Sequence, residues 1–202
     1  MKIAVSIDSS AWNWLFRNAI DISVALPPEE FSLFVTLHIE SEISAIPNEG
    51  SDGSDNRPLK RYIRESISRN QVATTATFGF AEANPPDGPA TIAGFGQGTF
   101  QSDVERAWYA RDDVQNQVIG KRPRKPGLLP KNAADASMGA ASFNGVALTC
   151  DKNKGPIKTA SKLGGNVVFL SGPLDAMSLR ETLRTAAQQF AGGDALTRAP
   201  QR

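Results

Sequence analysis

The sequence contains almost none of the residues that form disulfides and zinc sites. Its 202 residues include one cysteine, Cys150, and one histidine, His38. A single cysteine cannot form an internal disulfide, and one cysteine with one histidine is too small a ligand set for most zinc sites. We therefore expect any bound metal to be held by oxygen atoms.

Long apolar segments are missing as well. No stretch approaches 18 consecutive apolar residues, and the first apolar run meets an acid at Asp8, too early for the core of a signal peptide. The composition, with 40% hydrophobic and 21% charged residues, is that of an ordinary globular protein. We expect a soluble, cytoplasmic protein that has no membrane partner.

The net charge is only +1, but the charges are segregated along the chain. Residues 1–56 carry two cations and nine acids, a net charge of −7. Residues 57–202 carry 20 cations and 12 acids, a net charge of +8. The overall charge therefore says nothing about a polyanionic partner. The basic part of the chain is compatible with such a partner.

Short apolar runs alternate with amphipathic patterns along most of the chain. Strands are predicted at residues 2–7, 31–35, 72–80, 146–150 and 167–170. Helices are predicted to carry Trp12, Leu15, Phe16 and Ala19, to span residues 37–46, and to begin near Pro58, Ser102, Asn132, Pro156 and Ser178. This alternation predicts an α/β fold with a central, mostly parallel sheet.

The helix starts are predicted from side chains that can accept a hydrogen bond from the first turn. The predicted caps are Ser9 or Ser10, Thr36, Asn132 and the capping boxes Ser102–Glu105 and Ser178–Glu181. The last helix is expected to run to Gly192. We expect residues 193–202 to form a flexible tail.

Four carboxylates are predicted to converge on one edge of the sheet. Asp8 and Asp151 follow predicted strands, and open α/β sheets bind their ligands at the carboxyl ends of the strands. Glu42 lies nearer than Glu40 to the buried stripe of its helix, and Asp135 lies near the start of an alanine-rich helix. Converging carboxylates need a cation. Their oxygen atoms suit Mg²⁺ or Mn²⁺, which serve phosphoryl chemistry.

Each of these acids also has a simpler explanation. The alternatives are a helix cap for Asp8, a turn residue for Asp151, a charge favoured by the helix dipole for Asp135, and a solvated helix residue for Glu42, with Glu40 as the ligand in its place. Ser10, besides its predicted role as a cap, is expected to help hold a metal-bound water.

Three segments carry a resemblance to the PIN-domain ribonucleases. The opening motif of that family, an apolar strand followed by an acid, resembles IDSSAWNWLF, which contains Asp8. The second acidic motif, a glutamate before an aliphatic residue, resembles VTLHIESEI and selects Glu42. The third and fourth acids are similar to Asp135 and Asp151 in NAADASMGAASFNGVALTCDKNKG, where Thr149 stands at the family's hydroxyl position.

The resemblance implies a PIN-like three-layer α/β/α sandwich that cleaves RNA with Mg²⁺ or Mn²⁺ bound at these four acids. It also implies a homodimer and, for a toxin of this family, a cognate antitoxin protein. The chain is larger than the small toxin-type members of the family. We expect one PIN-like domain over residues 1–192 with a large insertion at about 47–130.

Basic segments flank the predicted site in the sequence. The candidate RNA-binding residues are Lys121, Arg122, Arg124, Lys125, Lys152 and Lys154. The first four lie in a proline-containing loop just before the predicted helix of Asp135. The cations at Lys60, Arg61, Arg64 and Arg69 fit a solvated helix face better than an RNA track.

The leading hypothesis is a metal-dependent ribonuclease in which an activated water attacks a phosphodiester. Two alternatives belong to other classes. One is a non-catalytic module of the same fold that binds RNA or protein, and the other is a different α/β phosphohydrolase that uses the acid at the end of the first strand.

Overall fold

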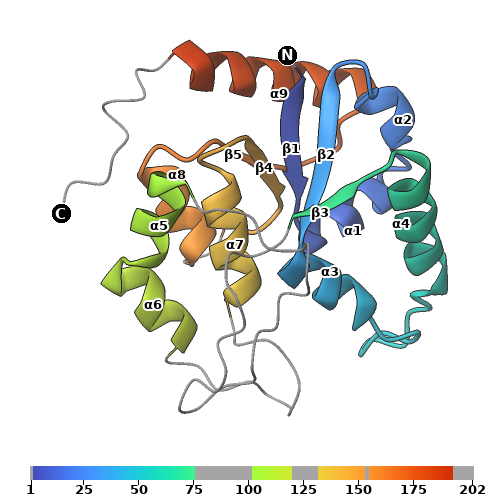
Figure 1. Cartoon of the computed structure of the whole chain (residues 1–202). Helices are drawn as coiled ribbons and strands as arrows, with labels where there is room; N and C mark the ends of the chain where they lie inside the picture. The colour runs from blue at the N-terminus through green and yellow to red at the C-terminus, as the bar shows by residue number, and fades with distance from the viewer. Residues whose placement is uncertain (1, 76–101, 120–131, 153–154, 193–202) are drawn as a thin grey trace.

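A five-stranded sheet forms the centre of the protein (Figure 1). The computed structural model describes residues 2–75, 102–119, 132–152 and 155–192. The strands are β1 (Ile3–Ile7), β2 (Phe31–Thr36), β3 (Ala73–Thr75), β4 (Val146–Thr149) and β5 (Val167–Phe169), in the order β3-β2-β1-β4-β5. Every pairing of these strands is parallel, so the predicted α/β class is confirmed and the sheet is wholly parallel.

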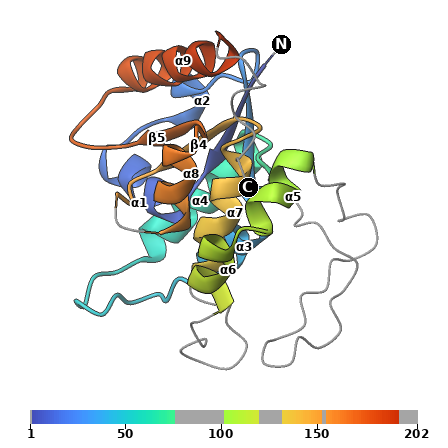
Figure 2. The same cartoon turned by 90° about the vertical axis from the view of Figure 1, so that its left-hand side faces the viewer.

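Helices cover both faces of the sheet (Figure 2). One layer contains α1 (Ser9–Arg17), α2 (Ile22–Ala25), α4 (Arg57–Arg69) and α9 (Ala176–Gly192). The other contains α7 (Ala133–Ala141) and α8 (Pro156–Lys162), with α5 (Asp103–Tyr109) and α6 (Asp112–Ile119) packed against α7. The remaining helix, α3 (Leu37–Ser44), follows β2 at the carboxyl edge and contacts both α1 and α7. The arrangement is a three-layer α/β/α sandwich.

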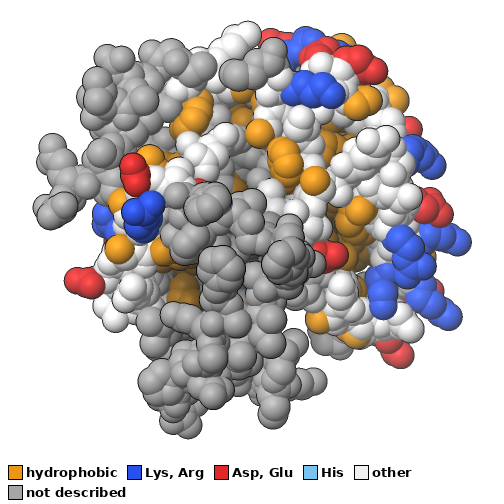
Figure 3. Space-filling model, in the orientation of Figure 1, with side chains coloured by type: hydrophobic (Ala, Val, Ile, Leu, Met, Phe, Trp, Pro, Cys, Tyr) orange, Lys and Arg blue, Asp and Glu red, His pale blue; other side chains and the backbone are white. Residues whose placement is uncertain are grey.

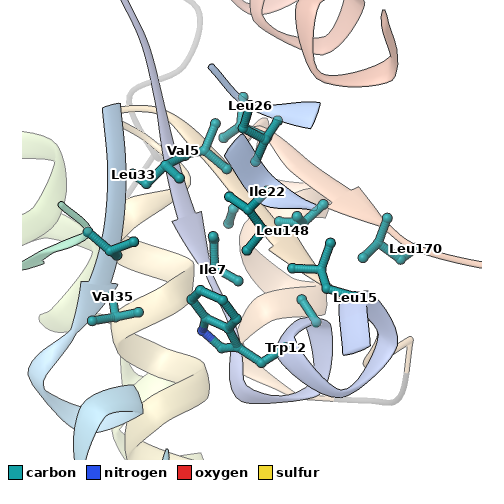
Figure 4. Packing of buried hydrophobic residues seen from close by; sticks show 14 of the residues in the cluster. Val5, Ile7, Trp12, Leu15, Ile22, Leu26, Leu33, Val35, Leu148 and Leu170 are labelled. Carbon is teal, nitrogen blue, oxygen red and sulfur yellow. The ribbon is translucent and has the colours of Figure 1, made fainter. Parts of the chain in front are cut away.

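The central strands β1 and β4 are apolar because both of their faces are covered. Val5, Ile7 and Leu148 are fully buried, and Trp12 and Leu15 of α1 pack beside them (Figure 4). Burial of each large aliphatic side chain stabilises the fold by about 1.5–3 kcal/mol. The core therefore fixes the carboxyl ends of β1 and β4 side by side.

The last helix, α9, is fixed to the amino edge of the sheet by an ion-pair cluster. Glu30, directly before β2, accepts hydrogen bonds from Arg180 and from Arg184, the latter at 2.6 Å. These side chains are only partly exposed, so water screens them less than a surface pair.

Several predicted helix starts are confirmed. The Thr36 hydroxyl accepts a hydrogen bond from the Ile39 amide and caps α3. Ser102 and Glu105 form a complete capping box at α5. Pro156 lies in the first turn of α8. Backbone amides in this turn have no hydrogen-bond partner within the helix, so proline, which lacks the amide hydrogen, is tolerated there.

Two other helix starts lack the predicted side-chain capping bond. The N-cap of α1 is Asp8, not Ser9 or Ser10, and no side chain makes the capping hydrogen bond there. Asn132 is the N-cap residue of α7, as predicted, but its backbone is left-handed, with φ of 67°, and its side-chain amide donates to the backbone carbonyl of Gln117. At the starts of α1 and α7, the side chains that were expected to accept from the first turn of the helix bond groups elsewhere in the structure.

The predicted capping box of the last helix is also wrong. The helix α9 begins at Ala176, and the Ser178 amide donates to the Asp175 carboxylate at 2.7 Å. Asp175 therefore accepts from the first turn of α9, the role that was expected of Ser178. The short helices α2 and α6 were not predicted.

Parts of the predicted organisation lie outside the described residues. These are residues 76–80 of the third predicted strand, the basic loop at 121–125, Lys154 and the tail at 193–202. Within the predicted insertion, α4 and β3 belong to the helix layer and the sheet, and α5 and α6 pack on α7. None of the helices in the described ranges has the length and apolar character needed to cross a membrane.

A second apolar cluster joins α5 to α7. Trp108 is 1% exposed, and its indole nitrogen donates to the Ala136 carbonyl at 2.9 Å. The ring lies so close to Gly139 that a β-carbon there would stand 2.5 Å from its Cζ2 atom. Gly139 is therefore required by the close approach of Trp108, although glycine weakens a helix interior.

We predict that Gly139→Ala destabilises the protein by about 1–3 kcal/mol, because the overpacked indole must move. At an open helix position the same change would instead stabilise by up to about 1 kcal/mol. The measurement is denaturant unfolding of Gly139→Ala alone and in a Trp108→Phe background, where the clashing ring atoms are absent. Equal effects of Gly139→Ala in both backgrounds would contradict the packing explanation.

Candidate functional site

Asp8 lies at the centre of the carboxyl edge of the sheet. It follows β1, whose last residue, Ile7, pairs with Leu148 of β4. The Asp8 amide continues this ladder by donating to the Leu148 carbonyl at 3.0 Å. The residue is only 4% exposed. A carboxylate in this position must be satisfied by neighbouring groups because water reaches it poorly.

Two hydroxyl groups satisfy one oxygen of the Asp8 carboxylate. Thr149 donates to Oδ2 at 2.7 Å, and Ser10 also donates to Oδ2. The same hydroxyls accept backbone bonds: the Cys150 amide donates to Ser10 at 3.0 Å and the Asp151 amide to Thr149 at 3.0 Å. The start of α1 and the chain after β4 are thus tied together through Asp8.

Glu42 reaches the same edge from α3. Ser9 donates to its Oε2 atom at 2.7 Å, so the residue next to Asp8 orients the second carboxylate. Partial burial raises the pKa of Glu42, the Ser9 hydrogen bond opposes that rise, and the nearby Asp8 charge adds to it. The contact with Ser9 favours Glu42 over Glu40 as the acid beside Asp8.

Asp135 and Asp151 complete the set of predicted acids. Asp135 lies in the first turn of α7, and its Oδ2 atom lies 3.4 Å from where a β-carbon on Gly155 would be. Gly155 directly precedes α8 at the carboxyl edge of the sheet. Asp151 is half-buried two residues beyond β4. All four acids therefore lie around the same edge.

A buried hydroxyl pair joins the helices that carry Glu42 and Asp135. Thr36 and Ser137, each 5% exposed, have their side-chain oxygens 2.8 Å apart. Ser137 donates to the Ala134 carbonyl at 2.7 Å, so the proton between the two hydroxyls comes from Thr36. This bond sets the spacing between α3 and α7. The sequence indicated Thr36 only as a cap and gave no sign of Ser137.

The donor set fits a hard divalent cation better than any other metal, because it consists of carboxylate and hydroxyl oxygens. Ser10 and Thr149 both use Oδ2 of Asp8, and neither uses Oδ1. Among the described residues, no Lys or Arg forms an ion pair with Asp8 or Glu42. Over these same ranges, no three His, Cys, Asp or Glu side chains are gathered closely enough to hold a metal ion. The acids share an edge without forming a closed cage.

Only one of the predicted RNA-binding residues has a described position. Lys152 is exposed beside Asp151, whereas Lys121, Arg122, Arg124, Lys125 and Lys154 lie outside the described residues. Ser9 was predicted only as a cap, although its place next to Asp8 was a signal that it could contact the site. An edge with paired carboxylates and an exposed lysine can bind a cation and an anionic group together.

The Thr149 hydroxyl is predicted to be the main stabilising contact of Asp8 from β4. Thr149→Val keeps the side-chain shape but leaves Asp8 with one hydroxyl and removes the acceptor of the Asp151 amide. We expect a loss of about 1–3 kcal/mol in the free energy of unfolding. Thr149→Ser, which keeps the hydroxyl, should retain most of the stability. Denaturant midpoints test this, and equal values for wild type and Thr149→Val would contradict it.

The raised pKa of Glu42 predicts a specific pH dependence without metal. An acid whose pKa is higher in the folded than in the unfolded state binds protons more readily when folded. The free energy of unfolding therefore falls as the pH rises from the unfolded-state pKa to the folded-state pKa. Glu42→Gln should remove this part of the fall. Unfolding free energies across that pH window, measured with a chelator, provide the test.

The matched control is Glu29→Gln, an exposed residue at the opposite edge of the sheet, just before β2. It should keep the wild-type profile. If Glu42→Gln also kept the wild-type dependence of unfolding free energy on pH, the raised pKa of Glu42 would be contradicted.

Comparison of the chain with protein-family models, with curated proteins and with solved structures finds no match in any of the three. The resemblance of three short segments to the PIN-domain ribonucleases therefore remains a resemblance of motifs. The case for a function depends on the geometry around Asp8 and on the chemistry of its oxygen ligands.

Proposed function

We propose that the chain is a PIN-like, metal-dependent ribonuclease whose active site is the carboxyl edge of the sheet around Asp8. The observation that carries the proposal is the environment of Asp8: a buried carboxylate at the end of the central strand, held by two hydroxyls and near enough to the Glu42 carboxylate for their charges to interact. A buried charge of this kind is expensive to keep unless it binds a cation. The motif resemblance supports RNA as the substrate.

The proposed roles follow from the contacts. Asp8, Glu42, Asp135 and Asp151 would hold Mg²⁺ or Mn²⁺, whose chemistry is to activate water and to neutralise charge on the phosphodiester. Ser10 and Thr149 hold Asp8 in one orientation through Oδ2 and leave Oδ1 for the ligand.

Two further contacts support the site from its edges. Ser9 holds Glu42 in the same way, with a hydrogen bond to Oε2. Lys152, exposed beside Asp151, supplies a positive charge for a phosphate of the substrate. The proposed cognate antitoxin and homodimer remain predictions that follow from the motif resemblance.

The decisive experiment is cleavage of single-stranded RNA by Asp8→Asn in Mn²⁺. Asparagine keeps an acceptor for the two hydroxyls but loses the negative charge, so we expect a folded protein whose cleavage rate falls by at least about a hundredfold. In a thermal scan, Mn²⁺ should raise the melting temperature of wild type and not that of Asp8→Asn, because a ligand stabilises only the state that binds it.

The matched control is Asp21→Asn. Asp21 and Asp8 are both N-cap residues directly before a helix, but Asp21 is exposed and accepts the Ser23 amide in a true capping bond. Asparagine caps equally well, so this variant should cleave like wild type.

Equal cleavage by wild type and Asp8→Asn would overturn the proposed function. Metal-independent RNA binding by wild type without any cleavage would favour the non-catalytic module. Hydrolysis of a small phosphomonoester in preference to RNA would favour the other phosphohydrolase.

A further inference from the structure

The outer face of α4 is strongly basic. The helix carries five cations and one acid, Glu65, over 13 residues. Its buried side consists of Leu59, Ile63 and Ser66. Arg57, Arg61 and Arg64 follow the spacing i, i+4, i+7, which places them together on the opposite side. We define this stripe of three arginines as the basic face of α4; it spans about 10 Å along the helix.

The cations of the helix are only partly engaged within the protein. Arg57 pairs with Asp55 at 2.8 Å, in an ion pair whose arginine side chain is 74% exposed. Lys60, beside the stripe, donates to Asn48 at 2.9 Å. Across the described parts of the chain, Arg61 and Arg64 form no ion pair with a carboxylate, although Glu65 is close in sequence.

Further positive charge lies beside this face. Lys and Arg side chains gather along the side of the molecule formed by α4, with Asp and Glu side chains among them (Figure 3). The neighbouring α1 ends in the exposed Arg17, and α1 and α4 are packed together, with the Phe16 and Tyr62 rings 5.6 Å apart. Arg17 therefore adds one cation on the helix packed against α4. It lies close enough to Asp52 that its charge, after the hydrogen bonds from Ser54, helps to lower the pKa of that carboxyl.

The chemistry of this face favours a polyanion over a protein partner. The exposed residues of α4 are all charged or serine: Arg57, Arg61, Arg64, Glu65, Ser68 and Arg69. A stable protein interface needs a buried centre with apolar or aromatic side chains, which the exposed residues of α4 do not offer; the exposed aromatic Phe16 belongs to α1. Guanidinium groups bind phosphates through paired hydrogen bonds, and a phosphate backbone requires no apolar contact.

The position of the helix connects this face to the candidate site. The chain passes from the carboxyl end of β2 through α3 to α4, and α4 then runs back toward the start of β3. The first turn of α4, with Arg57, therefore lies toward the edge where Asp8 and Glu42 are found.

The sequence alone favoured a solvated helix face for these cations. We propose instead that the basic face of α4 binds the phosphate backbone of single-stranded RNA and guides the strand toward the sheet edge that holds Asp8. The direction toward Asp8 rests on the proposed function, whereas the affinity for phosphates does not. The face acts through charge, so it contributes affinity without base specificity.

The test is binding of a fluorescently labelled oligouridylate to full-length protein in EDTA, over a series of salt concentrations. The variant Arg61→Gln/Arg64→Gln should bind about tenfold more weakly at low salt, and the magnitude of the slope of log K against log salt should fall by about 1.4. The matched control is Arg106→Gln/Arg111→Gln, which makes the same charge change in α5 and in the turn before α6, where both arginines are paired with aspartates. It should bind like wild type, and thermal unfolding checks that both variants are folded.

Binding by Arg61→Gln/Arg64→Gln with wild-type affinity and salt slope would overturn this inference, whatever the outcome for Asp8→Asn. Equal weakening in the α5 variant would also overturn it, because the effect would then follow net charge alone. Displacement of the RNA by a polyglutamate peptide at equal charge concentration would indicate an acidic protein as the partner instead. In Mn²⁺, the α4 variant should raise KM for RNA cleavage and leave kcat unchanged, a result that a folding defect would not give.

Discussion

The parallel pairing of β1 with β4 is the constraint on which the candidate site depends. The register that sets Ile7 opposite Leu148 also sets Asp8 beside Thr149, residues that are 141 positions apart in the chain. A shift of one residue would turn alternate side chains to the other face of the sheet, and the apolar packing of Val5 and Ile7 prevents that shift. The core thus determines which polar groups meet at the edge.

Hydroxyl groups do most of the orienting at that edge. Ser10 and Thr149 donate to Asp8, and Ser9 donates to Glu42. The hydrogen bond between Thr36 and Ser137 joins α3 to α7. Hydroxyls can donate to a carboxylate without neutralising it. The negative charge at the edge is therefore organised and retained, as a cation site requires, while the basic face of α4 lies on a separate helix.

Much of the fold was predictable because its signals are local. Apolar runs located all five strands, and the side-chain chemistry of Thr36, Ser102 and Glu105 located two helix starts. The predicted capping bonds of Ser9, Ser10 and Asn132 are absent, and each of these side chains instead bonds a group in another segment of the chain. Local propensity cannot reveal that competition, since the competing groups become neighbours only when the sheet forms and the helices pack on one another.

The sequence by itself determined that the protein has an α/β fold with a mostly parallel sheet, that Asp8 follows its first strand, and that a bound metal would need oxygen ligands, because strand and helix periodicity and residue chemistry act over short distances. Only the tertiary structure decided that Ser10 and Thr149 share one oxygen of Asp8, that Glu42 is the glutamate bound by Ser9, and that Ser137 links α7 to α3. These contacts depend on the order and register of strands that are distant in sequence. The physical reason is that a hydrogen bond needs its two atoms within about 3 Å, a distance that packing sets and sequence spacing does not.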